Sequence, residues 1–589
     1  MGAERGLEVT LSTHRLRAGS FGSSDDGTPA PLRVTALFTG SSVPWPGRPQ
    51  RGSPPLDVLW RSSVAACGLG HDRGVLNHEA LDAAVTALTS PELAPVVDVV
   101  AWVDPDAGRD QDGRPRAVLV ADHGGTARLD AEHPEGVVLE GRHPLPSTDP
   151  MAFLPYGEEA ADPSPPHDRN AYPLPWLRLA SFFSDRRSPD VAIVHTAAHW
   201  FPDEGGHHGE HGSLDVIQSR APFLVSGAGV TARGIVHDHA RLVDVMPTLA
   251  HAAGVPRDDL DGLDGRVRDD LVEPGADYVI GLLWDGGHPG SLLDLAARGE
   301  LPAIARLLDR GCALAGGAVA EFPSLTLVNH TSILTGVGPG RHGVVGNVYW
   351  DRDEQQRVVP NDPATWHRTG ELYRDGVVTL FEAVTAARPG VRTASVNEMT
   401  ERGSWASTFA LVRAALSSGE AVDPGQAGSG ESRDFVTAVR ALLPDPLASD
   451  LVTHARCAED DDYAFYSAID LLGLSTMVGL FSAPADERPR VAWWSQYTTD
   501  AAHHHGGPRS PIAVDGLRDC DARLGVLLDH LESIGVLDET LFLLTADHGF
   551  ETARDELTGS WTPALHAALD PLGVPWRDEG PGFLYLGGV

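Results

Sequence analysis

Residues 322–336, FPSLTLVNHTSILTG, decide how the rest of the chain is interpreted. Thr326 lies at the centre of this stretch, between a Pro-Ser pair and an Asn-His pair. A threonine hydroxyl is a poor nucleophile at neutral pH unless a base or a metal ion removes its proton. A catalytic role for Thr326 therefore requires metal ligands or a base elsewhere in the chain.

Candidate metal ligands follow three apolar runs that have the composition of buried strands. The runs are ADYVIGLLWDGG (276–287), VAWWSQYTTDAAHHHGGP (491–508) and ETLFLLTADHGF (539–550). In an open α/β sheet, ligands gather outside the carboxyl ends of the strands, so the polar residues that end these runs are expected at one edge of a sheet. Those residues are Asp285, then Asp500 with His504 four residues later, and then Asp547 with His548.

Four short motifs follow one another in the second half of the chain: PSLTLVNH (323–330), HGVVGN (342–347), DAAHHHGGP (500–508) and DHG (547–549). In kind and order they resemble the alkaline phosphatase superfamily, in its nucleotide pyrophosphatase/phosphodiesterase branch. That branch combines a P-[ST]-x-T-x-x-N-H nucleophile turn with H-G-x-x-x-N, D-x-x-x-H-x-x-G-P and D-H-G. One such motif would be weak support, whereas four in order are specific.

The resemblance implies both a fold and a metal centre. The expected fold class is α/β, an α/β/α sandwich with a central, mostly parallel sheet, a cap insertion and a small β-rich insertion. Two divalent metal ions are implied as cofactors, and mixed His and Asp ligands favour Zn²⁺, with Mn²⁺ or Fe as alternatives. By resemblance, the ligands of one ion are Asp285, Thr326, Asp547 and His548, and those of the other are Asp500, His504 and His211.

The implied chemistry is a two-metal phosphoryl transfer. The metal ion beside Thr326 lowers the pKa of its hydroxyl, which attacks phosphorus and forms a phosphothreonine. Asn347 is expected to bind the substrate by donating a hydrogen bond to a phosphoryl oxygen as charge develops there. The sulfatase branch is disfavoured, because it needs a Cys or Ser in a C/S-x-P-x-R frame and Thr326 lies in no such frame.

His211 precedes the nucleophile in the chain, which is unusual for this family. There, a G-x-H-G motif, a strand and a D-x-x-P-T helix close the catalytic domain. Here the same features come first, as GEHG (209–212), FLVSG (223–227) and DVMPT (244–248). The order of the motifs therefore predicts a circular permutation. The alternative is that residues 1–270 form a separate domain and that the GEHG motif is a chance match.

The predicted organisation has four parts. The cap is expected to determine substrate specificity. Its Asn397-Glu398 pair differs from the aromatic-containing motif that the phosphodiesterase branch has in this region, so nucleotide recognition stays open. The parts are residues 1–270, with a β-rich unit at about 95–145 and the rotated core segment at 185–266; residues 271–350, the catalytic core with the nucleophile; residues 351–485, the cap insertion; and residues 486–589, the second metal-binding part of the core.

Several candidate residues also have a purely structural interpretation. Asp285 could cap the helix that follows it. The histidines at 503–505 could belong to a solvated loop, although the D-x-x-x-H-x-x-G-P frame selects His504 among them. Asn329 and His330 are expected to brace the nucleophile turn rather than to contact the substrate.

Other histidines are expected to lie outside the site. Asp122 and His123 belong to a second D-H-G sequence, at residues 122–124, but the alternating residues that follow them predict a β-hairpin. His207 and His208 are expected to be loop residues, because only His211 has glycines on either side.

Length and composition exclude several other classes of protein. The chain has 589 residues, 42% of them hydrophobic, and a net charge of −37, so it can bury a large core but offers no basic surface for nucleic acid. No apolar run reaches about 18 residues and no leader segment is recognisable, which predicts a cytoplasmic protein that does not enter the membrane. The cysteines are far apart and form no CxxC pair, which disfavours a disulfide framework or a thiolate zinc site. They are Cys67, Cys312, Cys457 and Cys520.

The leading functional interpretation is a metal-dependent phosphoric ester hydrolase, a phosphodiesterase or nucleotide pyrophosphatase that works through a phosphothreonine intermediate. One alternative keeps the metal ions but acts on phosphomonoesters or phosphonates. An alternative of another class is a non-catalytic metal- or nucleotide-binding protein, which applies if the permutation has displaced His211. The expected partner is a small-molecule phosphate ester or a nucleotide.

Overall fold

The three apolar runs that end in candidate ligands form adjacent strands in an eight-stranded sheet. This computed structural model describes residues 77–161, 171–199, 207–361, 365–409, 461–554, 557–580 and 582–587. All of them belong to one compact unit, Ser42–Val589.

The eight-stranded sheet is mostly parallel, with the order β17-β16-β18-β11-β19-β8-β12-β9. Its centre is β11, which pairs in parallel with both β18 and β19, whereas β8 runs antiparallel to its neighbours β19 and β12. The strand bounds are β8 (Phe223–Gly227), β9 (Gly234–Val236), β11 (Tyr278–Trp284), β12 (Gly311–Leu314), β16 (Thr393–Val396), β17 (Ala406–Ser407), β18 (Val491–Gln496) and β19 (Thr540–Thr545).

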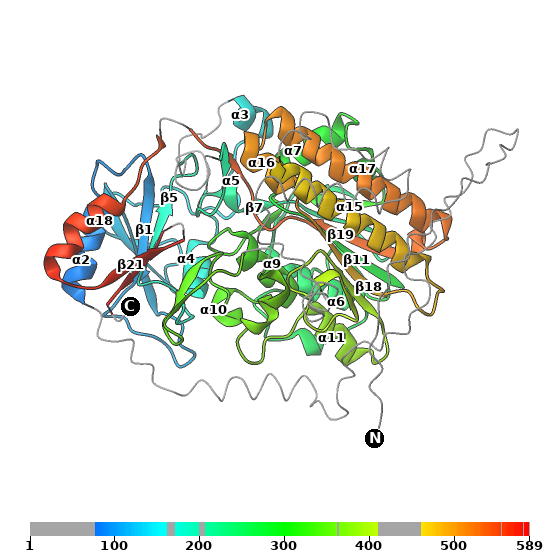
Figure 1. The fold of residues 1–589 in the computed structure, drawn as a ribbon, viewed down its shortest axis with the longest axis horizontal. Coiled ribbons are helices and arrows are strands. Elements are labelled where there is room, and N and C mark those ends of the chain that lie inside the picture. The colour runs from blue at the N-terminus through cyan, green and yellow to red at the C-terminus, as the bar shows by residue number, and fades with distance from the viewer. Residues whose placement is uncertain are drawn as a thin grey trace, which may run out of the picture. The chain divides into compact units, whose positions relative to one another are not determined.

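The central strands are buried along their whole length because helices cover both faces of the sheet. Every residue of β11, β18 and β19 is buried, as expected for parallel strands with two covered faces. On one side lie α7 (Pro289–Ala297), α8 (Pro302–Asp309), α15 (Asp461–Ser482), α16 (Thr498–Gly506) and α17 (Pro511–Ser533). On the other lie α6 (Val245–Ala252), α9 (Thr326–Thr335), α10 (Pro339–His342) and α11 (Leu380–Ala387) (Figure 1). The predicted α/β/α sandwich is confirmed.

A second, antiparallel sheet has seven strands in the order β21-β22-β5-β1-β2-β3-β4. One of its faces is covered by α2 (His78–Leu88) and α18 (Thr562–Leu569), which pack together (Figure 1). The strand bounds are β1 (Val97–Val103), β2 (Ala117–Asp122), β3 (Gly125–Asp130), β4 (Val137–Gly141), β5 (Val191–His195), β21 (Trp576–Glu579) and β22 (Phe583–Leu586).

The strands of this second sheet differ from the predicted organisation. The β-rich unit at about 95–145 supplies β1 to β4, but β5 and the pair β21–β22 also join the sheet. The sequence places β5 in the rotated core segment and β21–β22 in the second part of the catalytic core. The sequence could not separate β5 from a strand of the parallel sheet because the two have the same composition. β5 has the sequence VAIVH and is buried at every position, as the strands of the parallel sheet are.

The predicted cap also contains elements of the eight-stranded sheet. β16 and β17 are edge strands of this sheet, and α15 packs on α16, α17 and β18. TASV, the sequence of β16, is buried at every position and pairs in parallel with β18. The glycine-rich acidic loop at 419–433 lies outside the described residues, as do Cys67 and Cys457, whereas Cys312 and Cys520 are buried and free.

Among the described residues, one helix is long and apolar enough to cross a membrane: α15, over Tyr463–Ser482. The sequence alone did not reveal this run. Half of its apolar window is buried inside the protein, and Asp470 lies 3.3 Å from the guanidinium of Arg523 in α17. These contacts are those of a helix packed against its neighbours.

The segment that copies the DHG motif is a hairpin, as predicted. β2 and β3 are joined by the two-residue turn His123-Gly124. One oxygen of Asp122 accepts hydrogen bonds from the backbone N–H groups of Gly124 (2.7 Å) and Gly125 (2.9 Å). The carboxylate therefore serves the turn, which is the usual role of Asp at such a position.

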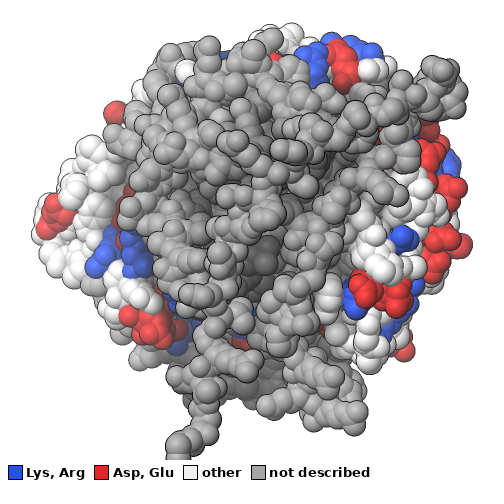
Figure 2. Space-filling model, turned by 45° about the vertical axis from the view of Figure 1, so that its right-hand side comes forward, with Lys and Arg blue, Asp and Glu red and all other residues white. Residues whose placement is uncertain are grey.

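Charged side chains on the described surface are mixed in sign. In the view of Figure 2, the blue basic groups lie next to red acidic groups on both flanks of the protein. Two such pairs lie near α8. Arg306 of α8 contacts Asp529 of α17 at 2.7 Å, and Arg310, the residue after α8, contacts Asp538 at 2.7 Å. Exposed pairs of this kind add little to stability, about 0–1 kcal/mol each.

Candidate active site

The carboxyl ends of β11, β18 and β19 bring three carboxylates together. Asp285 directly follows β11, Asp547 comes two residues after β19, and Asp500 lies in the first turn of α16, just after β18. Because the three strands are parallel and adjacent, their ends meet at one edge of the sheet.

The first cluster comprises Asp285, Asp547 and His548. All three are buried, and their ligand atoms lie within 4.8 Å of one another. His548 Nε2 is 3.6 Å from Asp285 Oδ1 and 3.1 Å from Asp547 Oδ2. The hydroxyl of Thr326 lies 3.5 Å from the same nitrogen. The structure therefore brings together all four residues that the resemblance assigns to one metal ion.

The second cluster comprises His211, Asp500 and His504, again with ligand atoms within 4.8 Å of one another. Asp500 Oδ1 is 4.0 Å from His211 Nε2 and 3.6 Å from His504 Nε2. The ring of His211 stacks on that of His548, with centroids 3.6 Å apart and an interplanar angle of 11°. The two clusters are therefore neighbours, and His211 reaches them from the N-terminal half of the chain.

A short strand pair positions His211. β6 (Gly209–Glu210) pairs antiparallel with β20 (Glu551–Thr552), which begins three residues after His548. Both glycines of the GEHG motif are required by the local structure. A Cβ at Gly209 would lie 2.2 Å from the carbonyl oxygen of His503, and Gly212 has a φ of +118°, which other residues rarely adopt. Both positions therefore require glycine.

Three histidines of the two clusters share one hydrogen-bonding arrangement. Each faces a backbone carbonyl with Nδ1 and the carboxylates with Nε2. A carbonyl can only accept, so Nδ1 carries the proton and the Nε2 lone pair is available to a metal ion. The carbonyl contacts are His211 to Ser324 (3.0 Å), His504 to Gly209 (2.9 Å) and His548 to Gly549 (3.2 Å).

The charges in the site fit a cation. Burial, together with the charges of Asp547 and Asp500, raises the pKa of Asp285 well above its usual range, and burial raises the pKa of Asp500 to about 7. Burial alone would lower the pKa of His548, but Asp547 raises it to about 9. A bound cation would replace that proton and relieve the repulsion between the carboxylates.

Unpartnered atoms also point into the clusters. Asp285 Oδ1, Asp547 Oδ2 and Asp500 Oδ1 are buried without a hydrogen-bond partner among the described residues. Buried carboxylate oxygens are almost always paired or bound to a metal ion. The donor set of carboxylate oxygens and imidazole nitrogens therefore fits divalent metal ions.

Thr326 is the first residue of α9, where the helix dipole favours negative charge. Asn329 braces the turn before it, as predicted. Its Oδ1 accepts from the N–H of Glu321 at 2.8 Å, and its Nδ2 donates to the carbonyl groups of Pro323 and Leu325 at 3.2 and 3.1 Å. These bonds fix the backbone that presents the hydroxyl.

Asn347 lies beside the same turn. Its Oδ1 accepts a hydrogen bond of 3.1 Å from the backbone N–H of Leu327, the residue after Thr326. This bond uses the amide oxygen, so the NH₂ group of Asn347 is the part that can donate to a ligand. Its predicted contact with a phosphoryl oxygen stays a prediction.

His330 lies beside the first cluster, a placement that sequence reasoning missed. Its Nε2 lies 3.5 Å from Asp285 Oδ2 and 3.7 Å from Asp547 Oδ2, and its Nδ1 lies 2.8 Å from Glu398 Oε2. Burial alone would lower the pKa of His330, but Glu398 and Asp285 raise it well above its usual range. One signal was available: His330 comes four residues after Thr326, which puts both on one face of α9.

The remaining histidines occupy the edge of the site. His503 faces the carbonyl of Gly286 with Nδ1 at 2.9 Å and belongs to neither cluster, whereas His504 belongs to the second. His207, predicted as a loop residue, lies 3.3 Å from Glu210 and forms with Glu210 and His504 a third group with metal-binding spacing. This group shares His504 with the second cluster.

Comparison with known proteins gives a family match over half of the chain. A family model described as type I phosphodiesterase / nucleotide pyrophosphatase matches residues 279–573. This range contains Thr326 and every candidate ligand except His211.

Two curated relatives from Saccharomyces cerevisiae match short segments. Ectonucleotide pyrophosphatase/phosphodiesterase 1 is 35% identical over 82 residues, 12% of this chain and 11% of the relative. Ectonucleotide pyrophosphatase/phosphodiesterase 2 is 33% identical over 92 residues, 15% of this chain and 18% of the relative. The chain therefore matches less than a fifth of the length of either relative.

Solved structures give a more distant likeness. Murine ectonucleotide pyrophosphatase / phosphodiesterase 5, in an inactive form with AMP, is 15% identical with a TM-score of 0.30, covering 46% of this chain and 57% of its own. Phosphonoacetate hydrolase from Sinorhizobium meliloti 1021, with phosphonoformate, is 21% identical with a TM-score of 0.29, covering 49% and 59%. Because these TM-scores are low, the fold assignment depends on the strand order and the direction of the strands in the eight-stranded sheet.

Proposed function

Because the chain belongs to the type I phosphodiesterase / nucleotide pyrophosphatase family, we propose that it is a metal-dependent hydrolase of phosphoric esters or phosphoanhydrides. The observation that supports this most is the placement of Thr326 beside two adjacent clusters of carboxylates and imidazoles. Diesters and pyrophosphates are the proposed substrate class.

The proposed metal sites follow the two clusters. Asp285, Thr326, Asp547 and His548 would hold one ion, and Asp500, His504 and His211 the other. Bound there, two divalent ions would stabilise charge on the phosphoryl oxygens and lower the pKa of the threonine hydroxyl.

The protein's own part in the reaction begins at Thr326. Its Oγ1 loses its proton to solvent and forms a bond to phosphorus in line with the leaving oxygen. The bond between that oxygen and phosphorus breaks, the leaving oxygen takes up a proton from solvent, and a phosphothreonine results. Water then attacks the phosphorus from the side that the leaving group vacated and releases the hydroxyl of Thr326. The NH₂ group of Asn347 and the N-terminus of α9 face the negative charge that develops on the phosphoryl oxygens.

We also propose that the chain is circularly permuted relative to its family. Two contacts support this. β8 pairs with β19 and β12 inside the eight-stranded sheet, and His211 lies next to Asp500 and His504. A separate N-terminal domain would supply neither a strand of this sheet nor a side chain of this site.

The test compares two aryl esters with the purified protein in the presence of Zn²⁺ or Mn²⁺. Bis-p-nitrophenyl phosphate should be hydrolysed faster than p-nitrophenyl phosphate if the substrate is a diester. The reverse ratio would instead indicate a phosphomonoesterase. Absence of turnover on both, with metal bound, would contradict the hydrolase proposal and leave a metal-binding protein.

A further inference from the structure

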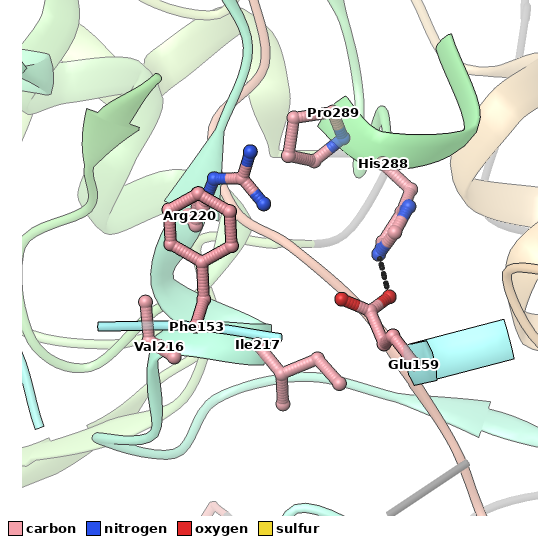
Figure 3. A pocket seen from close by; sticks show the side chains of 7 residues that line it. All are labelled: Phe153, Glu159, Val216, Ile217, Arg220, His288 and Pro289. Atoms are coloured by element: carbon pink, nitrogen blue, oxygen red, sulfur yellow. Dashed lines mark ion pairs between the residues drawn. The ribbon is translucent and has the colours of Figure 1, made fainter. Parts of the chain in front are cut away.

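A buried ionic network lies next to the two clusters without belonging to either. It comprises Glu159, His288, Arg509 and Glu551, and is called the Glu159 network below. His288 Nε2 and one guanidinium nitrogen of Arg509 each lie 2.8 Å from Glu159 Oε1. Figure 3 shows the ion pair of Glu159 and His288 in the lining of a small pocket. The second terminal nitrogen of Arg509 contacts Glu551.

Glu159 enters this network from a distant part of the chain. It lies in α3 (Tyr156–Ala161), a short helix that precedes β5 and packs on α7. Its carboxylate is buried, with the side chain 5% exposed, although its neighbour Glu158 is exposed. A second contact holds the helix, because the hydroxyl of Tyr156 lies 3.2 Å from Ser291 Oγ in α7.

Each partner of Glu159 follows a set of candidate metal ligands in sequence. His288 comes three residues after Asp285, and Arg509 comes five residues after His504. Glu551, which Arg509 links to Glu159, comes three residues after His548. Glu159 is therefore linked, directly or through Arg509, to the three segments that follow β11, α16 and β19.

The network also reaches the segment that carries His211. Glu551 is the first residue of β20, and its backbone pairs with Glu210 of β6, the residue before His211. Every segment that supplies a candidate ligand other than Thr326 is therefore linked to Glu159, either directly or through Arg509 and Glu551.

The acidic groups of the network are paired with basic ones, and little space is left for a ligand. Arg220, which stacks on Phe153 with its guanidinium carbon 3.6 Å from the ring centroid, adds a second buried cation to match the two glutamates. The pocket whose lining includes Glu159, Arg220 and His288 holds about 10 Å³, roughly one water molecule. Burial alone would raise the pKa of Glu159, but His288 and Arg509 outweigh it and the pKa is lowered, so the carboxylate stays ionised.

We propose that Glu159 is a positioning residue that holds the three segments following Asp285, His504 and His548 in their mutual arrangement, without contacting metal or substrate itself. The proposal rests on the proposed function in one respect, because it takes the clusters to be metal sites. Partners that orient ligand residues typically change metal affinity by 10–100-fold when they are lost.

The test uses the full chain with Glu159→Gln, which keeps the shape of the side chain and removes its charge. Glu158→Gln is the matched control, because it makes the same change one residue away on the exposed side of α3. Two quantities are measured: hydrogen exchange of the metal-free protein, and Zn²⁺ affinity by competition with a chelator. The values of kcat and KM on bis-p-nitrophenyl phosphate are measured as a third.

In Glu159→Gln, we expect faster exchange in all three segments together, at residues 285–291, 505–511 and 548–553. Zn²⁺ affinity should fall by about 10–100-fold. The value of kcat should fall while KM changes by less than about threefold, because no substrate contact is lost. Glu158→Gln should match the wild type in every measurement.

Faster exchange confined to α3, with Zn²⁺ affinity unchanged, would overturn the proposal. If Glu159→Gln does not fold, Glu159→Asp and Tyr156→Phe take its place, and unchanged exchange of the three segments in both would overturn it equally. A wild-type protein that binds no Zn²⁺ would refute the proposed function instead, while the exchange of these segments in the metal-free protein would still decide the role of Glu159.

Discussion

The ring of His211 donates a hydrogen bond of 3.0 Å from Nδ1 to the carbonyl oxygen of Ser324, two residues before Thr326. This bond ties a side chain from the N-terminal half of the chain to the turn that presents the candidate nucleophile. It also leaves the Nε2 lone pair of His211 facing Asp500. One residue thus joins the turn before Thr326 to the second cluster.

Replacing His211 with alanine should remove one ligand of the second cluster and leave the first intact. His211→Ala should bind about one Zn²⁺ fewer per chain and hydrolyse substrate at least tenfold more slowly, as measured by metal analysis and steady-state kinetics. His123→Ala is the control, because His123 lies in the β2–β3 turn, and it should behave like the wild type. If His123 proved essential and His211 silent, the assignment of the second cluster would be wrong.

Thr326→Ala should abolish turnover, because no hydroxyl remains to attack phosphorus. Three other side chains still form the first cluster, so the fold and most metal binding should persist. Thr326→Ser should retain part of the activity, since it keeps a hydroxyl. The check is a rate assay beside metal analysis and circular dichroism of each variant. Wild-type rates in Thr326→Ala would exclude Thr326 as the nucleophile.

Removal of metal should inactivate the protein and also destabilise it. Without cations, the buried oxygens of Asp285, Asp547 and Asp500 repel one another and lack partners. A ligand at 100 times its Kd stabilises the folded state by about 2.7 kcal/mol per site. Treatment with a chelator should therefore lower both activity and Tm, and Zn²⁺ or Mn²⁺ should restore both. Full activity in a metal-free preparation would contradict the two-metal proposal.

A fragment that starts at Asp277 should fail to form the native sheet. It lacks β8, so β19 and β12 lose the strand that lies between them. Circular dichroism and hydrogen exchange should show an incompletely folded and inactive fragment. A folded, fully active fragment of residues 277–589 would refute the permutation and make the N-terminal part a separate domain.

Acid should destabilise the protein in part through His342. This ring accepts a hydrogen bond at Nδ1 from the N–H of Val344 (3.1 Å), and burial lowers its pKa to about 3. An unfolded histidine has a pKa of about 6.5, so the unfolded chain binds the extra proton first. Above pH 6.5, protonation of His342 therefore does not affect the free energy of unfolding. Between pH 6.5 and 3, this residue lowers the free energy of unfolding by about 1.4 kcal/mol for each pH unit of acidification.

The pH dependence can be checked by urea unfolding between pH 7 and pH 5. His342→Asn should lower stability at pH 7 and reduce the loss on acidification, because one buried titrating group has gone. Equal slopes in the variant and the wild type would show that His342 does not titrate in this way.

Much of the candidate site is predictable from the sequence, because it depends on local patterns. Asp285, Asp500 and Asp547 follow runs that are buried on both faces, and parallel strands bring such ends together. The frame around His504 likewise selected the histidine that faces Asp500.

The parts that were missed depend on tertiary packing. His330 looked like a brace for the turn, and only the folded structure shows that it lies near three carboxylates, those of Asp285, Asp547 and Glu398. The strand β5 has the apolar run of a parallel strand, and its antiparallel partners β1 and β22 lie far from it in the sequence. Glu159 carries no motif, so its link to three segments could not be read from the sequence.

The position of β22 also has a consequence for biosynthesis. β5 is made early, but one of its edges pairs with β22, near the end of the chain. Likewise, β8 leaves the ribosome long before its neighbour β19 exists. Neither sheet can therefore form completely until these later strands have been made, and the nascent chain carries unpaired apolar strands in the meantime. We therefore expect its yield to fall when chaperones are depleted.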